Sequence, residues 1–520
     1  MTTRKIDFSD TRAFSSFFLD YIQQKDSLKK FYGRFPSLAN FGDQLKDKAS
    51  FSQAKRTLLV DVLTKQYSQL SISESAKANI DSLRDNKTFT VTTGHQLNVF
   101  TGPLYFIFKI VTVINACKAL KEKYPAYHFV PLYWMASEDH DYEEIKSFRL
   151  YGTKYMWQTE QQGAVGRFET KDFKNLINQL PGDVSVFKTA YEKNKTLASA
   201  VRQYVNTLFG AEGLVVVDGD DRQLKSLFTK VIQDDLFTHS AKKVVDLATQ
   251  ELQSLGYHTQ VNARDINLFY LDDGVRSRLE CEGDTFKVVD STLSFSKLEI
   301  EKMILAEPEK FSPNVVLRPL YQEMILPNLA YVGGPAELVY WLQLKGVFEF
   351  FQTPFPVLMP RNFGMVVDAP TQKKFSKTGL DIKDLFQEKN YLFNHWVANN
   401  SKHDLSLGKQ MQSLQSLLTE IQKKATTIDS TLTKLVAAEN QRALNGLERI
   451  EKKMLKAEKR KHEEKLKQIE SVKDALFPND SLQERTDNFL NFYQSDPAFI
   501  QKLLDAFDAF DFRFNVLMND

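Results

Sequence analysis

The residues best suited to chemistry lie in segment 93–105, which reads TGHQLNVFTGPLY. A neutral imidazole at His95 can donate a hydrogen bond to a phosphate or to a transition-state oxygen, and Gln96 adds amide donors beside it. A histidine that only fills a turn is the alternative interpretation. Because glycines and a threonine accompany the histidine, we predict that His95 and Gln96 are catalytic.

This segment joins an apolar strand to an apolar helix. The β-branched run at 88–93 is typical of a strand, whereas Thr101 can cap and Pro103 can open a helix that runs to about residue 123. In open α/β sheets ligands bind at the carboxyl ends of the strands, and helix N-termini favour anions such as phosphate. The residues predicted to hold a nucleotide here are Gly94, Thr101 and Gly102.

The predicted helix also carries two candidate substrate-binding residues, Tyr105 and Lys109. They are four residues apart and therefore share one face. Lys109 has apolar neighbours on both sides, so its amine either extends to solvent or points into the site. The sequence leaves both orientations open.

Three carboxylates and an imidazole follow the next apolar strand as Glu138-Asp139-His140-Asp141. Like charges at this spacing repel unless a cation, a ligand amine or a basic side chain compensates them. Carboxylates also suit Mg²⁺, a conceivable cofactor, but four successive residues cannot all face one ion. A solvated loop is the competing interpretation. We predict no metal centre, catalytic roles for Glu138, Asp139 and Asp141, and substrate contact for His140.

A third polar cluster lies at 318–337 and includes a glycine pair at the start of another predicted helix. The glycine pair allows close approach of the backbone, and the helix start offers free N–H groups to an anion. A tight turn required only for packing is the alternative. The candidates are Arg318, Gln322 and Glu337 for substrate binding and Gly333 and Gly334 for nucleotide binding.

A basic loop at 373–379, which reads KKFSKTG, follows the last predicted core strand. Lys374 and Lys377 could reach over the phosphates of a nucleotide, so both are nucleotide-binding candidates. A loop that is merely solvated is the alternative interpretation.

The elements that would position these residues alternate between strands and helices. Segments 88–93, 129–135 and 213–217 are strand-like, end in polar residues and are separated by helical stretches, which predicts an α/β fold with a parallel sheet. Further expected elements are strands at 315–319, about 329–334 and 356–360, and a helix at 335–350.

Other segments surround this predicted core, which we assign to residues 1–395. Residues 11–85 show helical spacing and are expected to cover the sheet. Residues 257 to about 300 look like short hairpins, with a turn at Asp272-Asp273-Gly274. We therefore place inserted subdomains at about 150–210 and 257–312.

Residues 404–476 have apolar residues at alternating spacings of three and four, which indicates a coiled coil. A break is expected at 426–430, and Pro478 should end the second helix. Such a rod must pair with its own first helix or with another copy of the chain, so we predict a homodimer through this arm. The phenylalanine-rich segment within 479–520 is expected to pack back on the body as helices.

Composition excludes several classes of protein. The 68 basic and 66 acidic residues of the 520-residue chain nearly cancel, which gives no reason to expect nucleic acid or a membrane surface as a partner. Only two cysteines occur, and the N-terminus lacks the apolar core of a secretory signal, so we expect a cytoplasmic protein.

Three long segments together resemble the BshC family of cysteine ligases of bacillithiol biosynthesis. They are TGHQLNVFTGPLYFIFK at 93–109, VPLYWMASEDHDYEEI at 130–145 and VLRPLYQEMILPNLAYVGGPAELVYW at 316–341. The resemblance implies a Rossmann-like core related to class I aminoacyl-tRNA synthetases, with inserted connecting subdomains, a C-terminal coiled coil and a homodimer. The histidine-rich and lysine-rich signatures of those synthetases are incomplete in this chain.

The resemblance also implies a reaction, in which the carboxyl group of cysteine is joined to the amine of glucosaminyl-malate. We expect ATP to activate the carboxylate near residues 94–105, and Arg318 to suit the malate carboxylates because guanidinium binds carboxylates in a bidentate manner. A nucleotidyltransferase acting on a small molecule and a non-catalytic coiled-coil interaction protein are the two rival functions.

Overall fold

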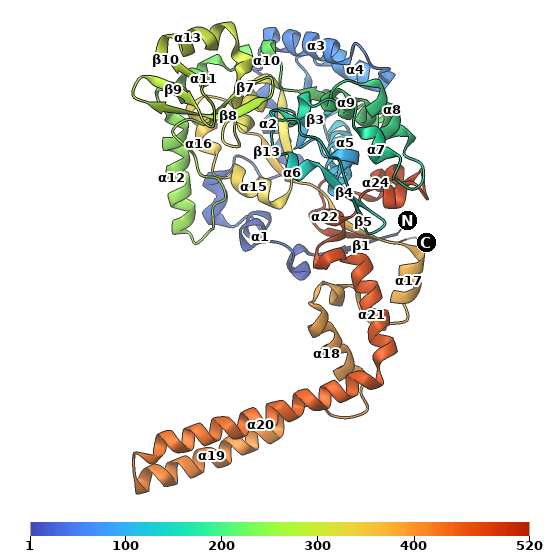
Figure 1. The fold of residues 1–520 in the computed structure, drawn as a ribbon, viewed down its shortest axis with the longest axis vertical. Coiled ribbons are helices and arrows are strands. Elements are labelled where there is room, and N and C mark those ends of the chain that lie inside the picture. The colour runs from blue at the N-terminus through green and yellow to red at the C-terminus, as the bar shows by residue number, and fades with distance from the viewer. Residues whose placement is uncertain (1, 519–520) are drawn as a thin grey trace.

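The computed structural model describes residues 2–518. A globular body contains the sheets, and a helical arm extends from it (Figure 1). The central sheet has five parallel strands in the order β13-β12-β2-β3-β6. Their bounds are β2 Thr88–His95, β3 His128–Met135, β6 Val215–Asp218, β12 Asn328–Gly333 and β13 Val357–Pro360. The predicted α/β class with a Rossmann-like parallel core is confirmed.

The strand order places a topological switch point between β2 and β12. From β2 the chain adds β3 and then β6 on one side, whereas β12 and then β13 lie on the other side. At such a point the helices after the two adjacent strands diverge and leave a crevice at the carboxyl edge. Here β2 ends at His95 and β12 ends at Gly333, so the predicted clusters meet at this crevice.

Strand β2 is buried along nearly its whole length although four of its residues are threonines. The hydroxyls of Thr90 and Thr92 donate to Asn328 Oδ1 at 3.0 and 2.8 Å, and the hydroxyl of Thr93 donates to the Val332 carbonyl at 2.8 Å. Burial of a hydroxyl is costly unless it is hydrogen-bonded. These bonds therefore fix the register of β2 against β12 at the switch point.

Helix α5 (Tyr105–Lys123) follows β2, and its beginning differs from the prediction. Thr101 does not cap this helix, because it lies in a short 3-10 turn with φ of 70° and Leu104 precedes the first helical residue. The C-terminal segment covers this junction: Leu104 N–H donates to the Asp487 carbonyl at 2.7 Å, and the Asn488 amide donates to the carbonyls of Phe100 and Gly102.

Two further local predictions were wrong. Residues 315–319 form no strand; α14 (Arg318–Ile325) begins there, after a turn in which Asn314 Oδ1 accepts the Val316 N–H at 2.8 Å. The helix predicted from 335 to 350 is divided into α15 (Pro335–Trp341) and α16 (Lys345–Phe350). In the first case a side-chain cap outweighs the strand preference of two valines.

Additional elements surround the central sheet. An N-terminal strand and helices comprise β1 Thr2–Ile6, α1 Ser16–Ile22, α2 Phe41–Lys48, α3 Gln53–Tyr67 and α4 Glu74–Ser82. Between β3 and β6 lie α6 Tyr142–Ile145, β4 Ser147–Leu150, β5 Thr153–Met156, α7 Phe173–Ile177, α8 Ser185–Lys193 and α9 Leu197–Phe209. Between β6 and the inserted sheet lie α10 Arg222–Ser226, α11 Thr229–Phe237 and α12 Ser240–Ser254.

The expected hairpins form a second sheet, which is antiparallel and has the strand order β10-β9-β8-β7-β11. Its strands are β7 Leu268–Asp272, β8 Val275–Glu282, β9 Thr285–Val288, β10 Ser294–Ser296 and β11 Phe311–Pro313, with α13 Lys297–Ala306 between the last two. This inserted sheet contributes residues to the crevice.

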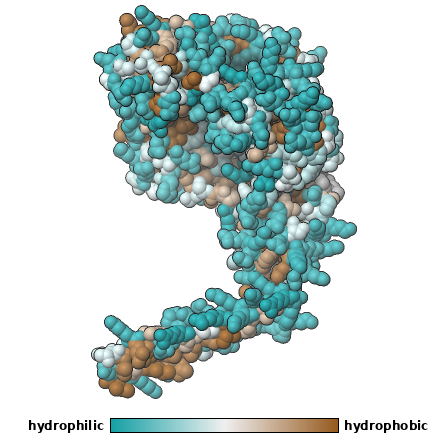
Figure 2. Space-filling view, in the orientation of Figure 1, coloured by the Kyte–Doolittle hydropathy of each residue, from teal (hydrophilic) through white to brown (hydrophobic). Residues whose placement is uncertain are grey.

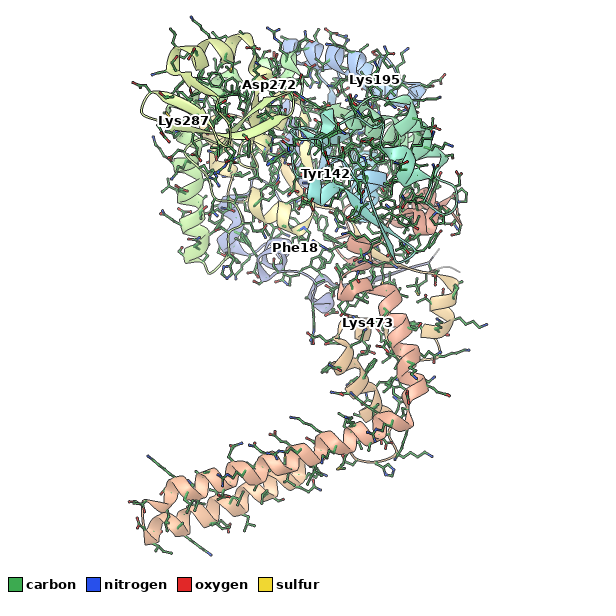
Figure 3. The ribbon with its side chains drawn as sticks, in the orientation of Figure 1. Phe18, Tyr142, Lys195, Asp272, Lys287 and Lys473 are labelled. Carbon is green, nitrogen blue, oxygen red and sulfur yellow. The ribbon has the colours of Figure 1, made fainter. Side chains whose placement is uncertain are left out.

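The arm is a helical hairpin of α19 (Gly408–Ile428) and α20 (Leu432–Lys461) (Figure 1). The break expected at 426–430 is present between them. A further break at His462 separates α20 from α21 (Glu463–Leu476), which joins the arm to the body beside α17 (Ala369–Phe375) and α18 (Lys389–Asn400). Lys473 marks this root of the arm (Figure 3).

The C-terminal segment returns to the body as α22 Gln483–Thr486, α23 Leu490–Tyr493, α24 Phe499–Ala506 and β15 Phe514–Met518. Phe507 packs against Phe108 of α5, with ring centroids 5.0 Å apart. Strand β15, which the sequence analysis did not anticipate, pairs antiparallel with β1 and parallel with β14 (Phe363–Val367). The two ends of the chain therefore share one sheet.

Candidate active site

The carboxyl edge of the central sheet opens into a cleft of about 720 Å³. It lies at the switch point and is bounded by the ends of β2 and β3, by α5, α14 and α15, and by the inserted sheet. The predicted site residues that line it are Gly94, His95, Gln96, Tyr105, Lys109, Glu138, Asp139, His140, Arg318, Gly334 and Glu337. The fold thus gathers residues from three separate sequence clusters.

His95 ends β2 and packs against aromatic rings of α5. Its ring centroid lies 5.4 Å from that of Tyr105 and 5.2 Å from that of Phe106, and its Nε2 has no hydrogen-bond partner among residues 2–518. Burial, together with the charges of Lys109 and Arg361, lowers the pKa of His95 well below its usual value. The imidazole is therefore neutral at pH 7 and has one ring nitrogen available to a ligand.

Lys109 points into the cleft, which settles its orientation. Its ammonium lies 2.7 Å from Glu337 Oε2 and donates to the Gly94 carbonyl at 2.8 Å. Glu337 also accepts the Tyr331 hydroxyl at 2.9 Å and the Gly334 N–H at 2.6 Å. Burial alone would raise the pKa of Glu337, but these partners keep it lowered, so the carboxylate stays charged. The pair links the two sides of the switch point.

Arg318 begins α14 and has no carboxylate partner among the residues that the structure describes. Its Nη1 donates to Gln322 Oε1 at 3.2 Å, and Gln322 donates in turn to Glu323 at 3.1 Å. Glu323 is held by Lys48 at 2.8 Å inside the body. Gln322, predicted to bind substrate, lies behind the cleft lining and orients the guanidinium instead.

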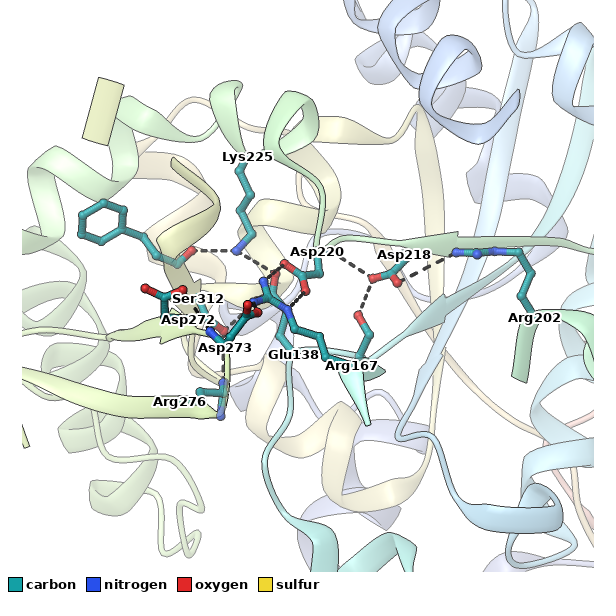
Figure 4. A network of polar contacts seen from close by, with 12 residues as sticks. Glu138, Arg167, Arg202, Asp218, Asp220, Lys225, Asp272, Asp273, Arg276 and Ser312 are labelled. Atoms are coloured by element: carbon teal, nitrogen blue, oxygen red, sulfur yellow. Dashed lines mark hydrogen bonds and ion pairs between the residues drawn. The ribbon is translucent and has the colours of Figure 1, made fainter. Parts of the chain in front are cut away.

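The end of β3 supplies the acidic side of the cleft. Glu138 lies 2.7 Å from the ammonium of Lys225, which is fully buried, and accepts the hydroxyl of Ser312 at 2.7 Å (Figure 4). The neighbouring Asp220, which follows β6, accepts from Arg167 Nε and Nη2 at 2.8 and 3.0 Å. The negative charge at this strand end is therefore compensated from within the protein.

Asp139 and His140 are oriented by two neighbours. The Gln96 amide donates to Asp139 Oδ2 at 2.8 Å, so this amide is directed at the carboxylate. Arg276 of the inserted sheet lies 2.5 Å from His140 Nδ1 and 3.8 Å from Asp139 Oδ1, and stacks on Phe269 at 4.0 Å. Because arginine only donates, His140 Nδ1 accepts and its proton resides on Nε2.

Several predicted site residues lie outside the cleft lining. Asp141 caps the short helix α6, where its carboxylate accepts the Glu144 N–H at 3.2 Å. Thr101 and Gly102 are buried beneath the C-terminal segment. Lys374 donates to Ser471 of α21 at 3.1 Å, and the Lys377 carbonyl accepts from Lys465, so the predicted phosphate loop packs on the arm root.

Gly333 also lies just behind the lining, and its carbonyl accepts the Arg361 N–H at 3.0 Å. Arg361 is one of four cleft arginines that were not selected from the sequence; the others are Arg264, Arg276 and Arg485. Arg361 directly follows β13. The criterion that selected His95, a polar residue at the carboxyl end of a strand, would therefore also have identified Arg361. Arg264 and Arg276 come from the inserted region and Arg485 comes from the C-terminal segment, and none of the three lies in a motif.

The acidic residues do not offer a ready metal centre. No group of three or more His, Cys, Asp or Glu side chains suited to one ion occurs within residues 2–518. The carboxylates of Glu138 and Asp139 already have basic or amide partners. We therefore derive no step through a protein-bound metal. No helix in the same described range has both the length and the apolar character of a membrane span.

The fold and the cleft define a Rossmann-like α/β protein with a polar site at the switch point, inserted subdomains and a helical arm. Comparisons with known sequences place it more narrowly. Two family descriptions match: "Bacillithiol biosynthesis BshC, N-terminal Rossmann-like domain" over residues 1–362, and "Bacillithiol biosynthesis BshC, C-terminal coiled-coil domain" over residues 364–518. The chain belongs to the BshC family.

Full-length relatives agree with this assignment. Proteins named "Putative cysteine ligase BshC" are 41% identical in Flavobacterium psychrophilum, over 99% of both chains, and 40% identical in Cytophaga hutchinsonii, over 98% of both. A protein of the same name in Salinibacter ruber is 30% identical over 95% of this chain and 94% of its own. The predicted resemblance is confirmed, and the family is one of ligases in bacillithiol biosynthesis.

Proposed function

We propose that the protein joins the carboxyl group of L-cysteine to the amine of glucosaminyl-malate, at the expense of ATP. Membership of the BshC family supports the substrates, and the cleft supports the chemistry. The observation that carries this proposal is that one cleft is lined by charges of both signs: the carboxylates of Glu138 and Asp139, and the guanidinium of Arg318, which has no carboxylate partner among the described residues.

The proposed reaction has two steps. The cysteine carboxylate first attacks a phosphorus atom of ATP and forms an acyl-phosphate anhydride, with pyrophosphate or ADP as the leaving group. The sugar amine then attacks the acyl carbon, and the C–N bond forms as AMP or phosphate departs. An amine that is bound as ammonium must lose one proton before it attacks and a second proton as the amide forms, and a base in the cleft must accept the first.

The side chains that line the cleft suggest which residue would act in each step. Asp139 is oriented by Gln96 and can hold the ammonium form of the amine and accept its proton. His95 is neutral, and its free Nε2 can contact the oxygen on which charge develops if that nitrogen carries the proton. Arg318, held by Gln322, offers a planar donor for a malate carboxylate or a phosphate.

The nucleotide would be held by a smaller set of residues than the sequence suggested. Gly334 lines the cleft with φ of −77°; its N–H is donated to Glu337, and its lack of a side chain leaves room for a phosphate to approach the backbone. Gly94 lines the opposite side at the end of β2. Thr101, Gly102, Lys374 and Lys377 are not part of this proposal, because the structure places them elsewhere.

We further propose that the arm forms a homodimer. Helices α19 and α20 cover each other only in part, and apolar side chains gather on the surface toward the tip of the arm (Figure 2). The exposed large apolar residues of these two helices are Leu417, Ile421, Ile428, Leu435 and Ile450. A two-helix hairpin with such residues in water is stabilised when a second copy covers them.

The direct test is product formation from cysteine, glucosaminyl-malate and ATP, followed by mass spectrometry of the amide and of the nucleotide products. We expect His95→Gln to lower kcat about 100-fold, with His403→Gln, in the segment between α18 and α19, as the matched control. Amide formation that does not require ATP would overturn the nucleotide step. Pyrophosphate release without any amide would favour a nucleotidyltransferase, and the absence of both products would contradict the enzyme assignment.

A further inference from the structure

Side chains of helix α22 form hydrogen bonds with the open edge of strand β14, which begins shortly after the cleft residue Arg361. Strand β14 lies at the edge of the sheet β1-β15-β14. Glu484 Oε2 accepts the Gly364 N–H at 2.8 Å, and Gln483 Oε1 accepts the Val366 N–H at 2.7 Å while its amide donates to the Val366 carbonyl at 3.1 Å. Two side chains thus take the place of a neighbouring strand, which fixes α22 on the body.

The same helix is tied to the cleft through Arg361. The Arg361 guanidinium lies 2.5 Å from Glu484 Oε1, and both side chains are almost fully buried, at 3% and 0% exposure. On its other side this guanidinium lies over the ring of Tyr105 at 5.1 Å. The contact between α22 and the cleft wall is therefore a buried ion pair, which holds the next residue of α22 in a defined place.

That next residue is Arg485, which lines the cleft and is exposed. It makes no ion pair and no side-chain hydrogen bond within the part of the chain that the structure describes. Its charge acts on Tyr105, since burial raises the pKa of that phenol and the charges of Arg361 and Arg485 oppose the rise. Arg318 and Arg264 are further cleft cations without a carboxylate partner among the described residues, whereas Lys109 and Arg361 are each neutralised by a glutamate.

We propose that Arg485 binds an anionic group of the aminosugar substrate, a dicarboxylate, and that α22 is thereby a substrate-binding element of the C-terminal domain. The identity of the substrate rests on the proposed function. The planar fork of a guanidinium matches a carboxylate with two parallel hydrogen bonds, and a cleft that holds several guanidiniums without a carboxylate partner, Arg485 and Arg318 among them, suits a dicarboxylate. Glu484 and Arg361 are positioning residues in this arrangement.

Calorimetry on the full-length protein tests this assignment without requiring catalysis. The probes are L-malate and inorganic phosphate, each titrated into the wild type, Arg485→Gln, Arg485→Lys and Arg442→Gln. Arg442 is an exposed arginine of α20 in the arm and serves as the control. We expect L-malate to bind the wild type, about tenfold weaker binding to Arg485→Gln, a smaller loss for Arg485→Lys, and no change for Arg442→Gln.

Calorimetry and the assay for amide formation together distinguish a failure of this inference from a failure of the proposed function. Unchanged malate binding in Arg485→Gln, or no binding of malate to the wild type, overturns the role of Arg485. Phosphate binding that depends on Arg485, without malate binding, overturns the dicarboxylate assignment in favour of a nucleotide. If malate binding depends on Arg485 while the wild type forms no amide, the subsite stands and the ligase proposal fails. If amide forms and Arg485→Gln leaves KM for glucosaminyl-malate unchanged, only the subsite fails.

Discussion

Lys109 Nζ lies 2.7 Å from Glu337 Oε2 and joins the helix after β2 to the helix after β12 across the switch point. The lysine is 3% exposed and the glutamate 26%. A buried charge that loses its partner strongly destabilises a fold, whereas removing both charges costs little. This pair therefore supports the shape of the cleft as well as its charge.

Replacing Lys109 with methionine should lower the free energy of unfolding by about 3 kcal/mol, because the Glu337 carboxylate would keep only neutral partners. The double variant Lys109→Met/Glu337→Gln should recover most of this loss. Urea denaturation followed by circular dichroism measures both values. Equal stability of the single and double variants would contradict a coupled pair.

His95 should make stability depend on pH below its ordinary pKa. Because its pKa is lowered in the folded protein, the unfolded chain takes up a proton as pH falls through about 6.5 while the folded protein does not. The contribution of His95 to the free energy of unfolding is therefore complete above about pH 6.5. Below that pH it decreases by up to about 1.4 kcal/mol per pH unit.

The comparison of wild type with His95→Gln between pH 7.5 and 5.5 isolates this dependence. We expect the variant to lose less stability on acidification than the wild type does. His258→Gln, a substitution of an exposed histidine, is the control. Parallel pH curves for wild type and His95→Gln would show that His95 is not held neutral.

Arg276 should lower the pKa of His140. Burial is the main cause of the lowered value and the Arg276 charge is the second, while Asp139 and Asp141 act in the opposite direction. Arg276→Gln should therefore raise the pKa of His140 toward its ordinary value, as measured by NMR titration of the imidazole C–H signals. Arg278→Gln, two residues along the same strand and paired with Glu280, should leave it unchanged.

Gly334 and Gly219 should respond differently to alanine. A Cβ on Gly334 would lie 3.3 Å from the Glu337 carboxylate, which would have to shift slightly, whereas a Cβ on Gly219 would lie 2.5 Å from the ring of Trp134. We expect Gly334→Ala to fold with a small loss of stability and to raise KM for ATP, because the added methyl group would stand between the backbone and an approaching phosphate. Gly219→Ala should lower the melting temperature. Unchanged KM for ATP in Gly334→Ala would remove this glycine from the nucleotide site.

Replacing exposed apolar residues of the arm with glutamate should abolish dimerisation. Leu417 and Ile421 are four residues apart on α19 and are 54% and 43% exposed. We expect Leu417→Glu/Ile421→Glu to be monomeric in light scattering after size exclusion, with unchanged unfolding of the body, and Gln415→Glu to behave as the wild type. A wild-type monomer at micromolar concentration would rule out the proposed dimer.

The sequence allowed the central sheet to be predicted because its strands are continuous apolar runs that end in polar residues. That rule identified His95, Asp139 and Glu337 from three distant segments, and the structure brings them into one cleft. It misread residues 315–319, where the side chain of Asn314 caps a turn that two valines would otherwise extend into a strand.

Long-range contacts explain the remaining differences. The helix start after Thr101 looked free in the sequence, but Asp487 and Asn488 occupy it from nearly 400 residues away. Arg276 and Arg485 reach the cleft from segments with no recognisable motif. The orientation of Lys109 likewise depends on Glu337, a partner that local periodicity does not reveal.

One sheet contains strands from both ends of the chain and therefore ties the N-terminal and C-terminal regions of the molecule together. Residues 2–6 pair with residues 514–518, which pair in turn with 363–367. The two regions recognised by the family descriptions meet between residues 362 and 364, yet a strand from the first is hydrogen-bonded to a strand from the second. Cleaving the backbone at that boundary would therefore leave a nicked but assembled particle, and neither half expressed alone would possess a complete folding unit.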